Sequence, residues 1–267
     1  MNTTRILAPL VAATILAACA TEVPTYTPER DLAHRWVKNS ADYKAITRQT
    51  YAVATRDLAR FVDDKTWSAM PEQTAAENLP PAVILDVDET VINNVSFQLV
   101  FERPFTDRQL EMWDRQHVAE PVPGVVEFIA AARDAGVAVF FMTNRPCEKY
   151  PDEEAACPQK QTVIEGIREL GIPVEPEFVM LALERPEWTG EKLVRRELIA
   201  RDYRVIMLIG DDFADFVACA RDSFYPPCTE PATRASRLAD LDRYGHFWGN
   251  GWYILPGPMH GSWTSVR

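Results

Sequence analysis

Two aspartates, Asp86 and Asp88, stand at the end of a short apolar run in this chain. The run, residues 82–85, follows two prolines and predicts a fully buried parallel strand. Ligands of open α/β sheets bind beyond the carboxyl ends of the strands, where this pair falls. Two carboxylates about 4 Å apart repel by roughly 4 kcal/mol at an effective dielectric near 20, and a divalent cation or a proton relieves that repulsion. The alternative is a capped strand end followed by an exposed acidic turn.

Polar side chains also follow two later apolar runs, residues 137–142 and 205–209. The residues at these ends are Thr143, Asn144, Arg145, Asp211 and Asp215. Because ligand sites of parallel sheets lie at the carboxyl ends of the strands, we expect these residues to lie near Asp86 and Asp88. A chance surface pattern would not repeat at three strand ends, so the repetition marks a site.

These residue types suit phosphoryl transfer. Asp86 can attack phosphorus as a nucleophile, and Asp88 can protonate the leaving group and then activate water. Asp211 supplies a further hard oxygen of the kind that Mg2+ prefers. Thr143 offers a hydroxyl to the phosphoryl oxygens, and Lys192 adds positive charge in the first turn of a predicted helix. For Lys192 the alternative is an ordinary solvated surface lysine.

Helices and buried strands must alternate to position these residues. A long helix is predicted over residues 31–63, because Trp36, Tyr43, Leu58 and Phe61 recur at helical spacing. The further expected elements are helices over 125–135 and 159–170, a helix that Thr189 caps, and a short strand over 178–181. This alternation predicts an α/β protein with a doubly wound, Rossmann-like parallel sheet.

The stretch between the first strand and the next core helix is irregular and rich in aromatic residues. Thr106 and Gln109 form a capping-box pattern ahead of a short helix that carries Trp113. We therefore expect a small, mainly helical cap over the site, built from about residues 31–63 and 91–121.

Composition limits the class of partner. The chain has 267 residues, of which 47% are hydrophobic and 25% are charged, as in ordinary globular proteins. Its formal net charge of −11 argues against a nucleic-acid polymer as partner, since such binding depends on basic patches. An anionic substrate must instead be attracted by local positive charge.

The first residues are typical of a lipoprotein signal peptide, with Arg5 before an apolar stretch that is too short to span a bilayer. Residues 16–19 resemble a bacterial lipobox, which predicts removal of residues 1–18 and a lipid anchor on Cys19. Ala20 follows that cysteine and, by resemblance to other bacterial lipoproteins, favours the outer membrane. Residues 19–30 would form a tether and residues 31–267 the folded domain. A plain signal peptide is the alternative.

The four remaining cysteines form two local pairs. In an oxidising cell envelope this favours disulfides Cys147–Cys157 and Cys219–Cys228. A zinc site is the alternative, although no pair has the Cys-x-x-Cys spacing of common zinc sites.

Together these residues resemble the four motifs of the haloacid dehalogenase (HAD) superfamily: Asp-x-Asp-x-Thr from Asp86, the strand-ending Thr143, the isolated Lys192, and Gly-Asp-x-x-x-Asp from Gly210. More narrowly, residues 84–94 with 206–216 resemble the bipartite signature of class C acid phosphatases. That family includes the outer-membrane lipoprotein e type of nucleotidase. Trp36 and residues 41–49 also resemble its N-terminal helix, so the likeness covers about residues 31–263.

The resemblance implies a haloacid dehalogenase-like fold and Mg2+-dependent hydrolysis of small phosphomonoesters, with nucleoside 5′-monophosphates among the candidates. Asp86 would be the nucleophile and Asp88 the general acid and base. The Mg2+ ligands would be Asp86, the backbone carbonyl of Asp88, and Asp211. The other implied site residues are Thr143, Asn144 and Lys192 for phosphate, Asp215 to orient Lys192 or a metal-bound water, and Trp113, Arg145 and His260 for the rest of the substrate.

The chain departs from the family pattern at several places. Asp212 replaces an asparagine and adds a carboxylate that could compete for the metal. The aromatic residue that follows the first motif in the family is Phe97 here, which is a mild change. His260 stands where the family has an aromatic residue before Gly-x-Trp. The two cysteine loops look like additions to the family pattern.

Two other function classes remain. A metal-dependent glycosyltransferase could use Asp86 and Asp88 as a nucleotide-sugar metal site, but it leaves Thr143 and the Asp211–Asp215 motif without a role. A non-catalytic surface lipoprotein could bind a phosphorylated ligand or a partner, but such a protein needs no nucleophile.

Overall fold

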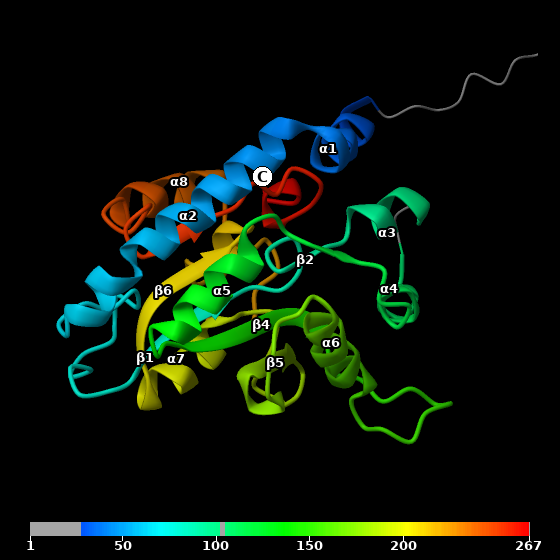
Figure 1. The fold of residues 1–267 in the computed structure, drawn as a ribbon. Helices are drawn as coiled ribbons and strands as arrows, with labels where there is room; N and C mark the ends of the chain where they lie inside the picture. Colours follow the sequence, from blue (N-terminus) through cyan, green and yellow to red (C-terminus); the bar gives the residue numbers. More distant parts are fainter. Residues whose placement is uncertain (1–27, 102–104, 267) are drawn as a thin grey trace, which may run out of the picture.

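A computed structural model of the chain describes residues 28–101 and 105–266, so Cys19 and the signal peptide lie outside the described residues. A five-stranded parallel sheet, in the order β5-β4-β1-β6-β7, runs through the centre (Figure 1). Its strands are β1 (Pro81–Leu85), β4 (Ala138–Pro146), β5 (Val179–Ala182), β6 (Arg204–Gly210) and β7 (Trp252–Ile254). The predicted parallel α/β fold is confirmed, and β7 is an addition to it.

The two faces of the sheet bury different layers, because successive side chains of a strand point to opposite sides. Val83 and Leu85 of β1 join one core cluster, which also holds residues of α2 (Ala41–Asp63), α5 (Val125–Asp134) and α6 (Pro158–Glu169). Ala82 and Ile84 join the other, with Ile199 of α7 (Leu193–Asp202). Helices on both faces make this a doubly wound sheet (Figure 1).

The single helix expected over residues 31–63 is two helices, α1 (Pro28–Asn39) and α2. Ser40 between them has an extended backbone, and its hydroxyl accepts a hydrogen bond from the Tyr43 amide at 2.9 Å. A serine N-cap of this kind satisfies an amide that a continuous helix would otherwise bond, which explains the break. The second half of α2, including Leu58 and Phe61, packs in the main core.

Residues 92–121, which we call the cap, form small elements beside the sheet. A two-stranded antiparallel ribbon, β2 (Ile92–Asn93) with β3 (Glu120–Pro121), flanks α3 (Val95–Val100) and α4 (Asp107–Asp114). The predicted capping box at α4 is confirmed: the Thr106 hydroxyl accepts from the Gln109 amide at 3.2 Å, and the Gln109 side chain accepts from the Thr106 amide at 2.8 Å.

The helix expected to begin at Thr189 begins later. α7 starts at Leu193, and Lys192 itself is the N-cap residue. The Thr189 hydroxyl instead accepts a hydrogen bond from the Glu191 amide at 3.2 Å, a local turn that competes with helix initiation. The remaining elements are α8 (Arg234–Arg243) and the short helices η1 (Pro176–Phe178), η2 (Phe213–Asp215) and η3 (Ser262–Thr264).

Both expected disulfides are present in the structure, Cys147–Cys157 and Cys219–Cys228. None of the helices in the described part of the chain combines the length and the apolar character that a membrane span requires.

Candidate active site

A cavity of about 210 Å³ lies where β1, β4 and β6 end. Its lining residues are Asp86, Asp88, Asn144, Arg145, Lys192, Asp211, Asp212, Asp215, Arg221, His260 and Gly261. Most of the residues singled out from the sequence thus meet in one place. Thr143 lies directly behind this lining, fully buried, with its hydroxyl on Asp88.

Lys192 links two acids of the cavity. Its ammonium donates a short hydrogen bond to Asp86 Oδ1 and a second one, of 2.7 Å, to Asp215 Oδ1. The side chain of Lys192 is 4% exposed, so a solvated surface lysine is excluded. Lys160, the other lysine in this part of the sequence, pairs with Glu184 at 2.6 Å instead.

The Asp86 carboxyl carries an unrelieved electrostatic cost. Burial raises its pKa to about 7, and repulsion by Asp215 and Asp88 adds to burial, although the Lys192 ammonium opposes both. A nucleophilic carboxylate must be ionised, so this position needs more positive charge than Lys192 supplies.

Three carboxylates supply a place for that charge. Oxygen atoms of Asp86, Asp211 and Asp215 all lie within 4.8 Å of one another. Burial, followed by repulsion from Asp86 and Asp215, raises the pKa of Asp211 well above its ordinary value. Clustered carboxylate oxygens of this kind, on two buried acids and one half-buried acid, fit a hard divalent cation. The expected pairing of Asp86 with Asp211 is present, and Asp215 joins them.

Two glycines let these acids approach the backbone. A Cβ atom at Gly210 would lie 2.3 Å from Asp215 Oδ2, and one at Gly257 would lie 2.6 Å from Asp211 Oδ2. Any other residue at either position would displace an acid of the cluster. Gly257 comes from the loop after β7, a contribution that the sequence did not reveal.

Asp88 is held as a carboxylate by three donors. Thr143 donates to it at 2.9 Å, Asn94 at 2.8 Å and the Arg145 Nη2 atom at 2.7 Å. Burial raises the pKa of Asp88, but the Arg145 guanidinium and these hydrogen bonds outweigh burial and lower it to about 2.

Arg145 extends this contact to the cap. Its Nη1 atom forms a short ion pair with Asp114, the last residue of α4. Burial raises the pKa of Asp114 to about 6, with repulsion from Asp88 acting in the same direction and Arg145 against it. Arg145, expected at the substrate, lines the cavity, and its guanidinium lies between Asp88 and Asp114.

Comparison with known proteins agrees with this geometry. Residues 11–263 match the family model described as HAD superfamily, subfamily IIIB (Acid phosphatase). The chain belongs to this acid phosphatase family. Two solved structures of the class C acid phosphatase from Bacillus anthracis are similar to this chain. One is described as having tungstate bound (TM-score 0.70), and the other is described only as the structure of that enzyme (TM-score 0.68). Each is 22% identical, with 88% of this chain and 86% of the other covered, and at that identity they show a shared fold.

Behind the active site of this acid phosphatase, two buried arginines of α7 donate hydrogen bonds to backbone carbonyls of site residues. Arg195 donates to the Thr143 carbonyl at 2.6 Å and to the Asn144 side-chain oxygen at 2.6 Å. The Asn144 amide nitrogen donates to the Gly190 carbonyl at 2.9 Å. Arg196 donates to the carbonyl of Asp215. Asn144, expected to bind phosphate, thus has both ends of its side chain in internal hydrogen bonds.

Asp212 has a different role from the one expected. It accepts hydrogen bonds from the Ser262 amide and hydroxyl, both at 2.5 Å, and from the Ala214 amide at 2.9 Å. Of the described acids, Asp86, Asp211 and Asp215 form the cluster, and Asp212 stands outside it. Its carboxylate therefore connects the C-terminal segment to η2.

The C-terminal segment brings His260 to the cavity. The His260 Nε2 atom lies 2.6 Å from Glu89 Oε2, and Glu89 is almost fully buried next to Asp88. Trp113, the other expected substrate residue, does not line this cavity within the described chain. Its ring lies 6.0 Å from that of Phe97 and 6.1 Å from that of Phe101, in an aromatic cluster of the cap.

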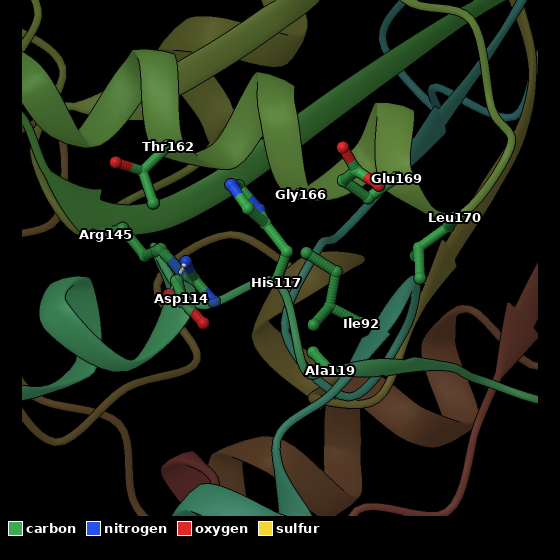
Figure 2. A pocket seen from close by; sticks show the side chains of 9 residues that line it. All are labelled: Ile92, Asp114, His117, Ala119, Arg145, Thr162, Gly166, Glu169 and Leu170. Carbon is green, nitrogen blue, oxygen red and sulfur yellow. Dashed lines mark hydrogen bonds and ion pairs between the residues drawn. The ribbon is translucent and has the colours of Figure 1, made fainter.

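A smaller cavity of about 80 Å³ shares Arg145 with the active site, and Asp114, the ion-pair partner of Arg145, lines it as well (Figure 2). His117 points into it, and Thr162 and Glu169 of α6 border it. Such a volume holds a few water molecules. Of these two cavities, the larger one, which holds Asp86 and Asp88, is therefore the better fit for a substrate.

Proposed function

We propose that this acid phosphatase is a Mg2+-dependent phosphomonoesterase that forms an aspartyl-phosphate on Asp86. The observation that carries the proposal is the arrangement of Asp86 and Asp88. They share one cavity at the end of β1, where Lys192 contacts the first and Arg145 the second. Family membership favours this reaction over a glycosyltransferase and over a non-catalytic binding protein.

In the first step an Asp86 oxygen attacks phosphorus, and the bond between phosphorus and the leaving-group oxygen breaks. Asp88 gives its proton to the departing alkoxide. In the second step Asp88 accepts a proton from a water molecule that attacks the aspartyl-phosphate, which releases phosphate and restores Asp86. The Thr143 hydroxyl donates a hydrogen bond to Asp88 and would thereby orient the Asp88 carboxyl towards the cavity.

Arg145 suits the second step, because it stabilises the Asp88 carboxylate that acts as base. The first step needs a protonated Asp88. Since Arg145 also contacts Asp114, its guanidinium has a second carboxylate to hold it when Asp88 is neutral. The Arg145–Asp114 pair would thereby serve both protonation states of Asp88.

Asp86, Asp211 and Asp215, with the backbone carbonyl of Asp88, would hold the divalent cation that phosphatases of this superfamily generally use. When bound, it supplies positive charge that helps to neutralise the transferring phosphoryl group. Lys192, between Asp86 and Asp215, contributes further positive charge to the same oxygens.

Two variants test the mechanism. Asp86→Asn should abolish turnover, because a neutral amide cannot attack phosphorus. Asp88→Asn should still be phosphorylated by an aryl phosphate, whose leaving group needs little protonation, and then stall because the base is missing. Acid-quenched mass spectrometry should then find phosphate on the peptide that holds Asp86. Full activity in Asp86→Asn, or no turnover of any phosphomonoester by the wild-type protein with Mg2+, would refute the proposal.

Nucleoside 5′-monophosphates are the substrates to test first. This part of the proposal rests on the likeness of residues 84–94 and 206–216 to class C acid phosphatases of the lipoprotein e type. A panel of nucleoside monophosphates, sugar phosphates and aryl phosphates with Mg2+ would rank them. A clear preference for sugar phosphates would contradict the nucleotidase assignment while leaving the phosphatase chemistry intact.

The proposed location is the bacterial cell envelope, through a lipid on Cys19, with the outer membrane favoured by Ala20. The lipobox at residues 16–19 supports this, and both positions lie outside the described residues. Cys19→Ala should move the protein out of the membrane fraction and prevent its labelling with a radioactive fatty acid. Unchanged labelling and fractionation would rule the anchor out.

A further inference from the structure

The loop closed by the Cys219–Cys228 disulfide carries a cationic residue, Arg221, into the lining of the active-site cavity. Arg221 follows the apolar strand β6 by eleven positions and belongs to none of the motifs that marked the site in the sequence. Its presence in the cavity depends on how this loop is held.

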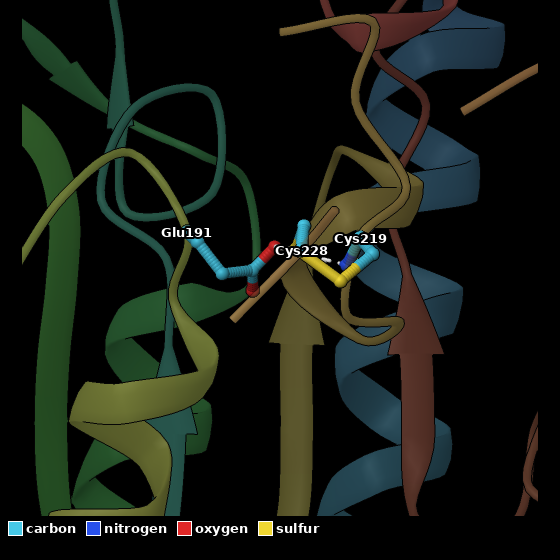
Figure 3. A group of neighbouring side chains, drawn as sticks. All are labelled: Glu191, Cys219 and Cys228. Atoms are coloured by element: carbon cyan, nitrogen blue, oxygen red, sulfur yellow. Dashed lines mark hydrogen bonds between the residues drawn. A yellow bond between two sulfur atoms is a disulfide. The ribbon is translucent and has the colours of Figure 1, made fainter. Parts of the chain in front are cut away.

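Glu191 fixes the loop to the segment that carries Lys192. Its buried carboxylate accepts hydrogen bonds from the Cys219 amide and from the Leu193 amide, both at 2.9 Å. Figure 3 shows Glu191 directed at the disulfide. Because the two cysteines are joined to each other, they offer no thiolate to a metal, and this group of three is a structural joint.

Two further contacts hold the loop. The Ala232 amide donates to the Arg221 carbonyl at 2.7 Å. Tyr225 packs so closely on Gly190 that a Cβ atom there would lie 3.2 Å from its ring. The disulfide, Glu191 and Tyr225 together place Arg221 on the same framework as Lys192.

The charges of the cavity are unevenly matched. Lys192 contacts two acids, and Arg145 contacts two others. Arg221 lies 3.9 Å from Asp212, beyond hydrogen-bond distance. Asp212 already accepts three hydrogen bonds from Ser262 and Ala214. The Arg221 side chain is 24% exposed, so its guanidinium can meet a ligand without breaking a strong internal contact.

We propose that Arg221 binds a second anionic group, a carboxylate or a second phosphate, on the leaving-group part of the substrate. This inference rests on the proposed phosphomonoesterase chemistry and names a substrate class different from the nucleoside 5′-monophosphates, whose leaving group is neutral. A chain with a net charge of −11 repels a substrate that carries extra negative charge, so selection for such a substrate requires a local cation at the cavity. A guanidinium suits both groups, because its parallel N–H donors match the oxygens of carboxylate and phosphate.

The test compares three matched esters: phenyl phosphate, 4-carboxyphenyl phosphate and 1,4-phenylene bisphosphate. For each we define a preference as kcat/KM relative to phenyl phosphate. Arg221→Gln should lower the preference for at least one doubly anionic ester by about 10-fold, since a charge-assisted contact is lost. Arg221→Lys should retain part of it. Arg56→Gln, the same charge change at an exposed position of α2, should leave all preferences unaltered.

Binding of the non-hydrolysable phosphonates, measured by calorimetry, separates this inference from the proposed function. Arg221→Gln should weaken 4-carboxyphenylphosphonate or 1,4-phenylenebisphosphonate about 10-fold more than phenylphosphonate. Which of the two responds identifies the second group as carboxylate or phosphate. If the phosphonates show this difference but no ester is hydrolysed, the proposed function fails and the Arg221 inference stands. If Arg221→Gln weakens all three ligands equally, or none, the inference is wrong.

Discussion

Two neighbouring aspartates after β6 serve different ends of the site. Asp211 faces Asp86 and Asp215 in the acidic cluster, whereas Asp212 holds Ser262. Burial raises the pKa of Asp212, but Arg221 and the hydrogen bonds from Ser262 and Ala214 outweigh burial. The pKa of Asp212 is therefore below its ordinary value of 3.8. A carboxyl that is more acidic in the folded state stabilises that state as long as it is ionised.

Asp212→Asn should therefore lower the free energy of unfolding by about 2 kcal/mol at pH 7, the size typical of hydrogen bonds to a charged group. The contribution of Asp212 is complete above the unfolded-state pKa and is lost as the pH falls through the lower folded-state pKa. Urea unfolding at pH 7 and at successively lower pH would show the difference between variant and wild type shrinking below pH 3.8. The exposed Asp134→Asn is the control, and an equal effect of both variants would contradict the role of Asp212.

At the residue scale, sequence reasoning identified the polar ends of three strands because the topology of a parallel sheet forces them together. Asp86, Asp88, Lys192 and Asp211 do meet in one cavity. Residues such as Asn94, Asp114, Arg195 and Arg221 were missed. Each of these residues reaches the site through a fold-specific turn, a buried helix face or a disulfide loop, so no spacing in the sequence predicts its position there.

At the element scale, the alternation of strands and helices predicted the sheet. Its apolar runs indicated parallel strands, because the strands of a parallel sheet are buried on both faces. The break at Ser40 was missed, since the hydrophobic stripe of residues 31–63 continues across it. Strand β7 was also missed. It has only three residues and follows Gly251 at a φ of 96°, so its length and its flank give little strand signal.

The other disulfide loop, residues 147–157, holds the cap helix α4. Glu153 contacts Arg115 at 2.7 Å and forms a short ion pair with Arg108, and Asp152 contacts Arg108 at 3.1 Å. Since α4 ends at Asp114, which contacts Arg145, this loop connects the disulfide to the active site through the cap.

Glu153→Gln should loosen α4, because an amide keeps the shape of the side chain but not the charge that both arginines contact. The expected result is faster amide hydrogen exchange over residues 107–114, with exchange in β1 unchanged. The neighbouring exposed Glu154→Gln is the matched control. Equal exchange in wild type and both variants would show that the ion pairs do not hold the cap.

At the scale of the whole molecule, the acidic cluster links folding to pH and to the proposed metal binding. Burial is the largest cause that raises the pKa of Asp86 to about 7 and the pKa of Asp211 well above its ordinary value. At these two groups the metal-free fold therefore binds more protons than the unfolded chain. The contribution of these two groups to the stability of the metal-free protein is therefore highest below the ordinary carboxyl pKa and falls as the pH rises towards 7. A divalent cation needs the ionised acids, so its stabilising effect has the opposite pH dependence.

Thermal unfolding should show both trends. With a chelator, the contribution of these acids should lower Tm between pH 4 and pH 7, whereas Mg2+ at about 100 times its Kd should stabilise the fold at pH 7 by about 2.7 kcal/mol. For a domain of this size that corresponds to a rise in Tm of roughly 5–10 °C. The rise should diminish towards pH 4, where protons occupy the same oxygens.

Asp211→Asn separates the cluster from general effects of pH and salt. It removes one proposed ligand and one acid with a raised pKa, so it should abolish the Mg2+-dependent rise in Tm and flatten the fall of Tm between pH 4 and pH 7 in chelator. Asp134→Asn, which changes the same charge on an exposed helix end, should do neither. If Mg2+ raised the Tm of the wild type and of Asp211→Asn equally, the cation would bind elsewhere, and Asp86, Asp211 and Asp215 would not be its ligands.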